Sequence, residues 1–430
     1  MNIVMFTNTY KPFVGGVERS VEMFTTEYRL KGHRTVIVTP EYEGAPSREF
    51  DVVRIPALQN FNGSDFSVKL PAPGVLSKFL EEFRPDLVHS HHPFLIGDTA
   101  LRVASSHRIP LVYTFHTLYE QYTHYVPGDS GPLKRFVMAL TTGYANLCDF
   151  VFAPSNSAAT MMRSRGVQAP LAVIPTGIYP ERYGRKGLPD LRKKLGIPPR
   201  ATVVGLVSRI APEKNIDFLA RTVAGFVAED DNRYFLVVGS GPALPTVHEI
   251  CAQYHVGSRL VCTGTLEGDL LAGAFRAMDV FAFASHSETQ GIVLAEAMAS
   301  EVPVVAVDAP GVREIVLDGE NGRLIGSDDG PRFSEALAWA VGLSLTDRWR
   351  VKRNARRTAQ NFGIDESVTR ALSVYDQLLQ RNGERVARDT SMWEDALQRI
   401  KIEWELVVNM TRATSAAFRK PPSVVQQDLG

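Results

Sequence analysis

Short apolar runs, rich in β-branched and aromatic residues, alternate with longer amphipathic stretches along most of the chain. The runs predict strands, and the stretches between them predict helices. Because the strands are apolar throughout, the pattern favours parallel sheets that helices cover on both faces. The predicted strands are Asn2–Thr7, Arg34–Thr39, Asp86–Ser90, Leu111–Phe115 and Asp149–Ala153, then Thr202–Ser208, Tyr234–Gly239, Arg259–Thr263, Val280–Ala284 and Pro303–Val307.

The alternation breaks at residues 177–199, which are rich in Gly, Pro and charge and predict a linker with one short helix. It then restarts, so we expect an α/β chain of two Rossmann-like parallel-sheet domains that face a cleft. Ligands of such folds bind outside the carboxyl ends of the strands. The expected division is residues 1–184, residues 185–365 and a helical C-terminal extension over residues 366–430, whose first helix packs back toward the N-terminal domain.

The last helical segment, residues 389–418, carries one apolar stripe at helical spacing. Such a stripe docks on the protein, forms a dimer seam or lies in a membrane interface, and the sequence leaves these alternatives open. Nearby basic residues favour the membrane, whereas Glu403 and Glu405 weaken that interpretation. The stripe consists of Trp393, Leu397, Ile400, Trp404 and Val407, and the basic residues are Arg399, Lys401, Arg412, Arg419 and Lys420.

Composition narrows the class of protein. A chain of 430 residues is long enough for two domains, and its 47 Lys and Arg balance its 47 Asp and Glu, so charge gives no argument for a nucleic-acid partner. The three cysteines form no CxxC pair and indicate buried thiols of a reducing compartment. The N-terminus has no basic leader, and no apolar run reaches the ~20 residues that cross a bilayer. We expect a cytoplasmic protein that is able to lie on the inner face of the membrane.

The segment "HSETQGIVLAEAM" lies where a predicted strand passes into a helix. The first helix amides, at Gly291, Ile292 and Val293, have no intrahelical partners and suit a diphosphate. Glu288 precedes them and Glu296 lies about two turns into the helix, where carboxylates accept sugar hydroxyls. Together these features predict a nucleotide-sugar site. The alternative is a capping glutamate and a solvated helix residue, and this motif alone does not decide between them.

Further candidates follow other strands. In "GLVSRIAPEKN", Arg209 and Lys214 are placed to clamp two phosphates and to neutralise the charge that grows on a leaving diphosphate, although a loop with ordinary surface charges is the alternative. Gly239 follows a strand, and Gly15 and Gly16 precede a helix, so each allows close approach to a ligand or simply makes a turn. The GxGxxG pattern of dinucleotide enzymes is missing here.

As a set, "ETQGIVLAEAM", "SRIAPEKN", "GGVE" and "IPTGI" resemble the retaining glycosyltransferases of family four, which have the GT-B fold. The resemblance covers about residues 1–382. It implies an acceptor-side first domain, a second domain that binds the donor nucleotide, and transfer of a hexose from a UDP- or GDP-sugar to an acceptor hydroxyl. It also implies that Glu288 contacts the transferred sugar, Glu296 the ribose, Arg209 and Lys214 the diphosphate, and Gly16 the sugar-diphosphate.

The same resemblance places His116 against the donor sugar near the reacting centre, and Gly264 to Leu266 is where backbone groups would meet the base. Retention through a covalent intermediate needs a carboxylate beneath the anomeric carbon. Glu120 and Asp129 are near in sequence, but nothing in the sequence positions them there. We therefore expect attack on the same face, with help from the leaving phosphate. Because the Arg/Lys pair takes the place of a cation, we expect no metal and no cofactor.

For the acceptor, "TFHTLYEQYTHYVPG" and "LVHSHHPFLIG" look most like the branch that glucosylates diacylglycerol at a membrane. Tyr119, Tyr122, Tyr125 and the apolar Pro93–Ile96 would line a lipid-accepting opening, because tyrosine suits a wet apolar edge. The alternative is that they pack a loop and helix. Other functions stay open: transfer to a soluble or carbohydrate acceptor, a sugar-nucleotide epimerase, a phosphorylase, or a non-catalytic nucleotide-sugar binding protein.

Overall fold

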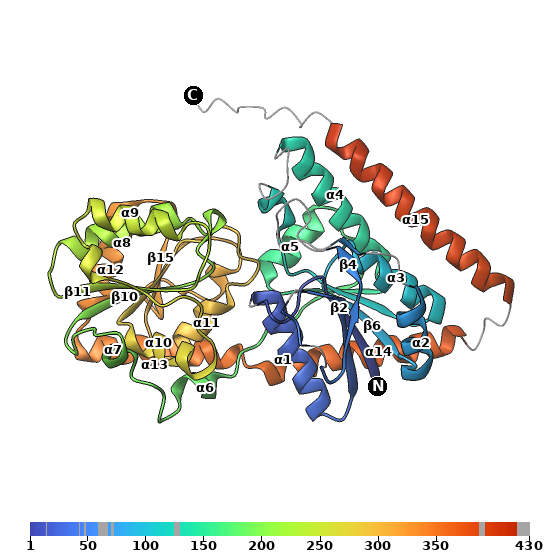
Figure 1. The fold of residues 1–430 in the computed structure, drawn as a ribbon, viewed down its shortest axis with the longest axis horizontal. Coiled ribbons are helices and arrows are strands. Elements are labelled where there is room, and N and C mark those ends of the chain that lie inside the picture. Colours follow the sequence, from blue (N-terminus) through green and yellow to red (C-terminus); the bar gives the residue numbers. More distant parts are fainter. Residues whose placement is uncertain are drawn as a thin grey trace.

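The computed structural model describes most of the chain, in segments that cover residues 1–13, 15–42, 44–46, 49–58, 68–69, 73–123, 130–386 and 392–418. Two parallel sheets with flanking helices lie side by side (Figure 1). This is the expected α/β architecture of two Rossmann-like domains, followed by long C-terminal helices.

The first sheet has the strand order β3-β2-β1-β6-β7-β8-β9, and its neighbouring strands are parallel. The order therefore reverses between β1 and β6, and such a reversal opens a crevice at the carboxyl ends of the strands. The strands are β1 (Asn2–Phe6), β2 (Arg34–Pro40), β3 (Val52–Ile55), β6 (Leu87–Ser90), β7 (Leu111–Thr114), β8 (Phe150–Ala153) and β9 (Leu171–Val173). A short antiparallel pair is formed by β4 (Ala57–Leu58) and β5 (Val68–Lys69). The helices are α1 (Gly16–Leu30), α2 (Pro73–Phe83), α3 (Ile96–His107), the 3₁₀ turn η2 (Tyr119–Gln121), α4 (Gly131–Leu147) and α5 (Asn156–Ser164).

The second sheet has the order β12-β11-β10-β13-β14-β15, also parallel, and reverses between β10 and β13. Its strands are β10 (Thr202–Val207), β11 (Arg233–Val238), β12 (Leu260–Cys262), β13 (Val280–Phe283), β14 (Val304–Val307) and β15 (Gly322–Ile325). Its helices are α8 (Ile216–Ala228), α9 (Leu244–Gln253), α10 (Gly268–Ala277), α11 (Ile292–Ala299), α12 (Gly330–Val341) and α13 (Leu345–Asn361).

All the strands predicted from the apolar runs are present, with ends that differ by at most one residue. The parallel strands missing from the prediction are β3, β9 and β15. Each is short and lies at an edge of its sheet. An edge strand is covered less completely than a central one, so its sequence need not be continuously apolar. The linker was also predicted incompletely, since it holds two short helices, α6 (Pro180–Gly184) and α7 (Leu191–Lys194), instead of one.

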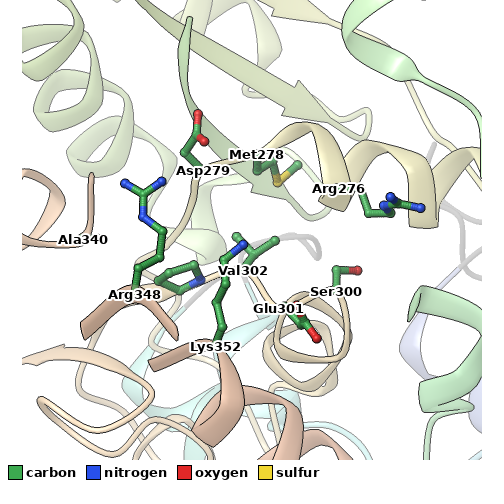
Figure 2. Close-up of a pocket in the computed structure, with 10 residues that line it drawn as sticks. Arg276, Met278, Asp279, Ser300, Glu301, Val302, Ala340, Arg348 and Lys352 are labelled. Atoms are coloured by element: carbon green, nitrogen blue, oxygen red, sulfur yellow. The ribbon is translucent and has the colours of Figure 1, made fainter. Parts of the chain in front are cut away.

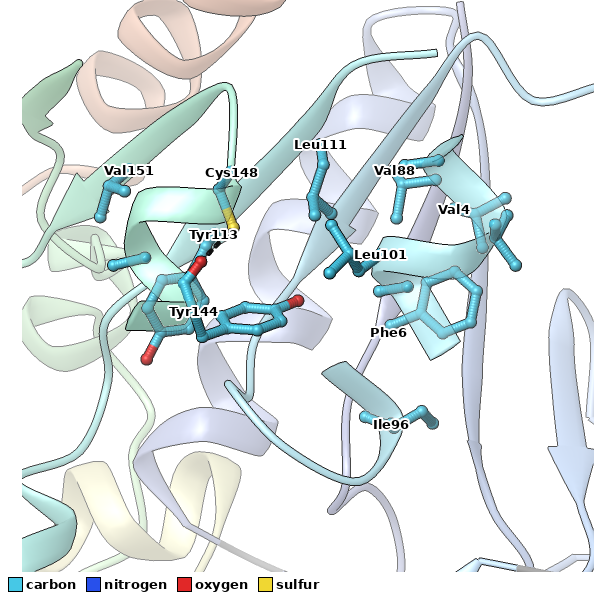
Figure 3. Close-up of a cluster of buried hydrophobic side chains, with 14 of the residues drawn as sticks. Val4, Phe6, Val88, Ile96, Leu101, Leu111, Tyr113, Tyr144, Cys148 and Val151 are labelled. Atoms are coloured by element: carbon cyan, nitrogen blue, oxygen red, sulfur yellow. Dashed lines mark hydrogen bonds between the residues drawn. The ribbon is translucent and has the colours of Figure 1, made fainter. Parts of the chain in front are cut away.

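One part of the core of the first domain lies between its sheet and helices α3 and α4. Figure 3 shows Tyr113 of β7 beside Tyr144 of α4, and Phe6 and Val88 of the strands belong to the same cluster of buried side chains. The Cys148 thiol donates to the Tyr144 carbonyl at 3.3 Å (Figure 3). All three cysteines are unpaired, two of them buried and one partly buried. This agrees with the thiols expected from the sequence.

Helix α14 (Ile364–Val386) leaves the second domain and packs in the core of the first (Figure 1). Its Tyr375 hydroxyl lies 3.0 Å from the Tyr28 hydroxyl and 2.5 Å from Nδ1 of His89, whose Nε2 lies 2.7 Å from the Thr114 hydroxyl. These groups are buried, so the network satisfies polar atoms that would otherwise destabilise the core. We propose that the domains divide after residues 184 and 365. The second boundary is supported by α14, which begins there and packs in the first domain.

The last helix, α15 (Met392–Phe418), packs along α4 and α3 of the first domain (Figure 1). Its docked face includes the buried Ile402, Asn409 and Ala413, and Arg135 of α4 donates to carbonyls at its end. The described part of the predicted stripe lies on another face. Trp404 and Val407 are 67% and 56% exposed, while the side chains of Trp393, Leu397 and Ile400 lie outside the described residues. Helix α15 therefore docks without using the described part of the stripe, which faces solvent.

Candidate active site

The loops at the carboxyl ends of the two sheets contact each other, and here we call this region the domain junction. Ser155, after β8, donates to the Thr289 carbonyl at 2.6 Å, and the Thr289 hydroxyl donates to the His116 carbonyl at 2.8 Å. The Gln290 side chain accepts from the Thr176 amide and donates to the Thr176 carbonyl, both at 2.7 Å. The end of the loop that follows β13 is therefore held against the first domain.

Lys214 and Glu288 form an ion pair at the reversal point of the second sheet. Lys214 follows β10, Glu288 follows β13, and their side-chain atoms lie 2.6 Å apart with each side chain less than one-fifth exposed. Burial by itself lowers the pKa of the Lys214 ammonium, but the Glu288 carboxylate outweighs burial and holds that pKa above its usual value. Lys214 is therefore a fixed positive charge at neutral pH. The Arg209 side chain is exposed, earlier in the same loop.

Helix α11 begins immediately after this loop. Gly291 is its N-cap, with a φ of 73° that a residue with a Cβ rarely adopts, and Ile292 and Val293 form the first turn. No side chain caps this end of the helix. The free amides expected at the start of the helix are thus placed at the carboxyl edge of the sheet, beside Glu288.

Glu296, on the same helix, is buried and contacts the first domain. Its Oε1 accepts from the Arg19 guanidinium of α1 at 2.9 Å and from the Tyr183 hydroxyl of the linker at 2.5 Å. Its other oxygen, Oε2, is buried and has no hydrogen-bond partner. Burial, and after it the Glu296 charge, raise the pKa of the Tyr183 hydroxyl, so Tyr183 stays a donor. Glu296 thus has one oxygen occupied and one available.

His116 lies on the opposite side of the junction, after β7. It is partly exposed, and its Nε2 lies 2.8 Å from Nδ1 of His91. Burial lowers the pKa of His116 to about 3, so the ring is neutral at physiological pH. The hydrogen bond from Thr289 to its carbonyl brings His116 next to the loop that holds Glu288.

The tyrosines predicted on the acceptor side lie in different surroundings. Tyr119 packs edge-on against Phe94, with ring centroids 4.7 Å apart, and its hydroxyl is buried. Tyr122 has a side-chain hydrogen bond with Ser287, and burial raises its pKa although the Lys214 charge opposes the shift. Tyr122 therefore lies at the Lys214–Glu288 ion pair as well. Tyr125 lies outside the described residues.

The glycines predicted near the ligand also differ in surroundings. A Cβ on Gly239 would lie 1.9 Å from the Ser208 carbonyl oxygen. A larger residue here would therefore clash with the backbone of the loop that holds Arg209. Gly264 accepts from the Gly239 amide at 2.8 Å, and Leu266 is partly buried in the core. Gly15 is the N-cap of α1, and a Cβ on Gly16 would meet no atom within 4 Å, which leaves room for a ligand at that turn.

Glu314, a residue the sequence analysis missed, caps a helix of the other domain. Its carboxylate accepts from the Asn156 amide at 2.8 Å and from the Ser157 amide at 2.6 Å, both at the start of α5. Arg19, Gln290 and Glu314 all act across the junction. Their position is the only sequence signal for them. Arg19 lies one turn after Gly16, and Gln290 and Glu314 lie in the segments that follow β13 and β14.

A separate hollow of about 270 Å³ opens at the opposite, amino-terminal edge of the second sheet (Figure 2). Asp279 and Val302, which precede β13 and β14, line it together with Arg348 and Lys352 of α13. None of the predicted site residues lines this hollow. The candidate active site is therefore the domain junction.

Known proteins resemble the chain in both halves. Residues 14–182 match the family described as Glycosyltransferase Family 4, and residues 189–358 match Glycosyl transferases group 1. The alpha-monoglucosyldiacylglycerol synthase of Streptococcus pneumoniae is 30% identical over 330 residues, which cover 75% of either chain. The GDP-mannose-dependent alpha-mannosyltransferase of Corynebacterium glutamicum is 27% identical over 90% of either chain.

Solved structures share the fold. Sucrose-phosphate synthase from Thermosynechococcus elongatus aligns with a TM-score of 0.73 at 19% identity, over 88% of this chain and 99% of its own. The Anabaena protein HepE in complex with UDP and glucose aligns with a TM-score of 0.69 at 22% identity, over 87% of this chain and 99% of its own.

Replacing Glu314 with Gln should destabilise the protein at neutral pH and have less effect in acid. Burial raises the pKa of Glu314, but hydrogen bonds from Ser157 and Asn156 outweigh it and hold that pKa below its usual value. A carboxylate whose pKa is depressed on folding stabilises above its unfolded pKa, about 4.3, and loses that contribution as the pH falls through the folded value. The melting temperatures of wild type and Glu314→Gln should therefore differ at pH 7 and converge below about pH 4.

The exposed Glu335, replaced by Gln, is the control. A melting difference for Glu314→Gln that stayed constant from pH 7 to pH 3 would contradict the capping role.

Proposed function

The chain belongs to the family 4 glycosyltransferases, and from this premise we propose that it moves a hexose, with retention of anomeric configuration, from a nucleoside-diphosphate sugar to a lipid hydroxyl such as that of diacylglycerol. The observation that carries the proposal is the Lys214–Glu288 pair, which lies at the reversal point of the second sheet and within reach of the His116 loop. It places a cation for phosphate and a carboxylate for sugar hydroxyls side by side.

On the donor side, we assign the diphosphate to Lys214, Arg209 and the first amides of α11. Cations and helix amides aimed at a leaving diphosphate stabilise the charge that develops as the glycosidic bond breaks. Glu288 would hold hydroxyls of the transferred sugar. The unpartnered Oε2 of Glu296 supports a ribose contact, because a buried acceptor without a partner is costly unless a ligand supplies a donor.

The reaction we propose proceeds on one face of the sugar. The bond from the anomeric carbon to the diphosphate oxygen breaks, the acceptor oxygen bonds to the same face, and the acceptor proton passes to the leaving phosphate. The neutral His116 contacts the sugar. Of the two carboxylates near in sequence, Asp129 lies outside the described residues. Glu120 supports this route, because its carboxylate is already paired with Arg165 at 2.5 Å. An ion-paired, buried carboxylate is a poor nucleophile for the anomeric carbon.

For the acceptor, the likeness to an alpha-monoglucosyldiacylglycerol synthase supports a lipid. Phe94 and Tyr119 form an apolar contact beside the His116 loop. Tyr122, three residues after Tyr119, has a hydrogen bond with Ser287 of the second domain. A soluble or carbohydrate acceptor is the alternative. The donor base stays open between uracil and guanine, since one relative is named for GDP-mannose and one related fold was solved with UDP.

We also propose that the enzyme works as a peripheral protein on the cytoplasmic face of a membrane. Helix α15 lies on the first domain, the acceptor side of the proposal, and its Trp404, Val407 and Met410 are each at least half exposed. A row of apolar side chains with tryptophan suits the interface of a bilayer. The described helices include none that is long and apolar enough to span a membrane.

Transfer of label from a nucleotide sugar to diacylglycerol in anionic vesicles tests the function. UDP-glucose and GDP-mannose are supplied in parallel, and free sugars and simple glycosides replace the lipid in matched reactions. We expect a labelled glycolipid with one of the two donors and little product with soluble acceptors. Efficient transfer to a soluble acceptor alone would reject the lipid, while epimerised donor, or tight donor binding without transfer to any acceptor, would reject the transferase proposal.

Glu288→Ala and Lys214→Ala should each lower kcat by roughly 10²–10³-fold, because each removes a group that acts on the transferring sugar-phosphate. The double variant removes the ion pair without leaving a buried charge alone, so it should melt near the wild-type temperature and still be inactive. Glu301→Ala and Lys352→Ala, at the far edge of the same domain, are the matched controls. Near-wild-type turnover in a folded Glu288→Ala would return the pair to a structural role.

Trp404→Ala should weaken binding to anionic vesicles by roughly tenfold or more, since burying a large aromatic side chain contributes ~1.5–3 kcal/mol. Trp349, on α13 of the other domain, is 63% exposed against 67% for Trp404 and is therefore the matched control. Sedimentation with vesicles measures the binding. Equal losses for Trp404→Ala and Trp349→Ala would contradict a membrane contact through α15.

A further inference from the structure

The segment "LVHSHHPFLIG" supplies three buried histidines, and the roles of two are clear from their contacts. His89 bonds to Tyr375 and Thr114 in the core, and Nδ1 of His92 accepts from the Asn8 amide at 3.0 Å. His91 is different. Its Nδ1 lies 2.8 Å from Nε2 of His116, and its Nε2 is buried without a hydrogen-bond partner. Its ring stacks between those of His89 and His116, with centroids 4.3 and 5.1 Å away.

The pair of nitrogens shares a single hydrogen, because both rings are neutral. Burial lowers the pKa of His116 to about 3 and lowers that of His91 well below its usual value. One ring must therefore donate and the other accept. Were His91 the acceptor at Nδ1, its hydrogen would sit on Nε2 and leave a buried N–H without a partner. Orphaned buried N–H groups are rarer in proteins than under-satisfied acceptors, so His91 donates and His116 accepts.

We propose that His91 is a positioning residue that holds His116 in the tautomer with its hydrogen on Nδ1, so that His116 offers a hydrogen-bond donor to the transferred sugar. The proposal rests on the sugar contact assigned to His116 above. His116 is partly exposed at the junction, so a hydrogen on its Nδ1 makes the ring a donor that a ligand there can meet. Thr289 holds the backbone of the same residue, and His91 holds its ring.

This tautomer has a chemical consequence. With Nε2 occupied by His91, the other nitrogen of His116 carries a hydrogen and has no lone pair with which to take a proton. His116 then acts as a donor to a sugar oxygen and not as the base for the acceptor. The proton of the acceptor hydroxyl passes to the leaving phosphate, as the same-face reaction requires.

Variants of His91 separate the hydrogen bond from the packing. His91→Asn keeps an amide N–H near the position of Nδ1, whereas His91→Leu removes the donor; His91→Phe also removes it but keeps a ring in the stack. We expect His91→Leu and His91→Phe to lower kcat by about 10–100-fold, the size typical of losing a group that orients a reacting residue, with the donor KM nearly unchanged. His91→Asn should recover much of that loss.

Nitrogen NMR of ¹⁵N-histidine-labelled protein reads the tautomer without any assay of activity, with the His116 signals assigned by their loss in His116→Asn. We expect a hydrogen on Nδ1 of His116 in wild type and His91→Asn, and a shift toward the Nε2–H form in His91→Leu and His91→Phe. His92→Asn, in the same buried segment but bonded to Asn8, is the control and should leave the His116 signals unchanged.

The proposal is overturned if His116 keeps the same tautomer in folded His91→Leu or His91→Phe, or if His91→Asn is no more active than they are. Wild-type kcat in His91→Phe would overturn it as well. Because the tautomer is measured independently of turnover, a protein that transferred no sugar at all would reject the proposed function and still give a result for His91.

Discussion

The packing of α14 into the core of the first domain is the interaction on which the geometry of the site depends. Tyr375 brings a residue that follows the second domain into contact with Tyr28 and His89 of the first. Since α14 is continuous with the end of the second domain, this buried network limits how the two sheets face each other. His89 also stacks on His91, and His91 bonds to His116. The interdomain helix and the proposed catalytic histidine are thus connected through rings in direct contact.

Parallel-sheet topology explains why the fold was largely predictable. Central strands such as β1 and β10 are buried on both faces, so their sequences are apolar throughout and distinct from the helices around them. The same topology explains why Lys214 and Glu288 could be expected to meet. They follow β10 and β13, which are adjacent although far apart in sequence. Three of the four edge strands, β3, β9 and β15, and the face on which α15 docks have weaker patterns, and those were missed.

Contacts across the junction were beyond reach of the sequence for another reason. Glu296, which we propose contacts a ribose through Oε2, has its Oε1 bound by Arg19 and Tyr183 across the junction. Nothing in the local pattern of α1 or α11 specifies that these residues meet, because their distance depends on how the domains are oriented. Gly239 illustrates the same limit at shorter range, since it makes room for the chain's own backbone at Ser208.

Because Glu314 of the second domain caps α5 of the first, separation of the two domains would remove hydrogen bonds from the start of that helix. Helix α5 also has a cap of its own, because Ser155 accepts from the Ala158 amide, but the Asn156 and Ser157 amides depend on the other domain. When the domains separate, those two amides are released to water, while the Ala158 amide stays bonded. Hydrogen exchange at Asn156 and Ser157, relative to Ala158, would therefore report how often the enzyme opens to admit substrate and release product.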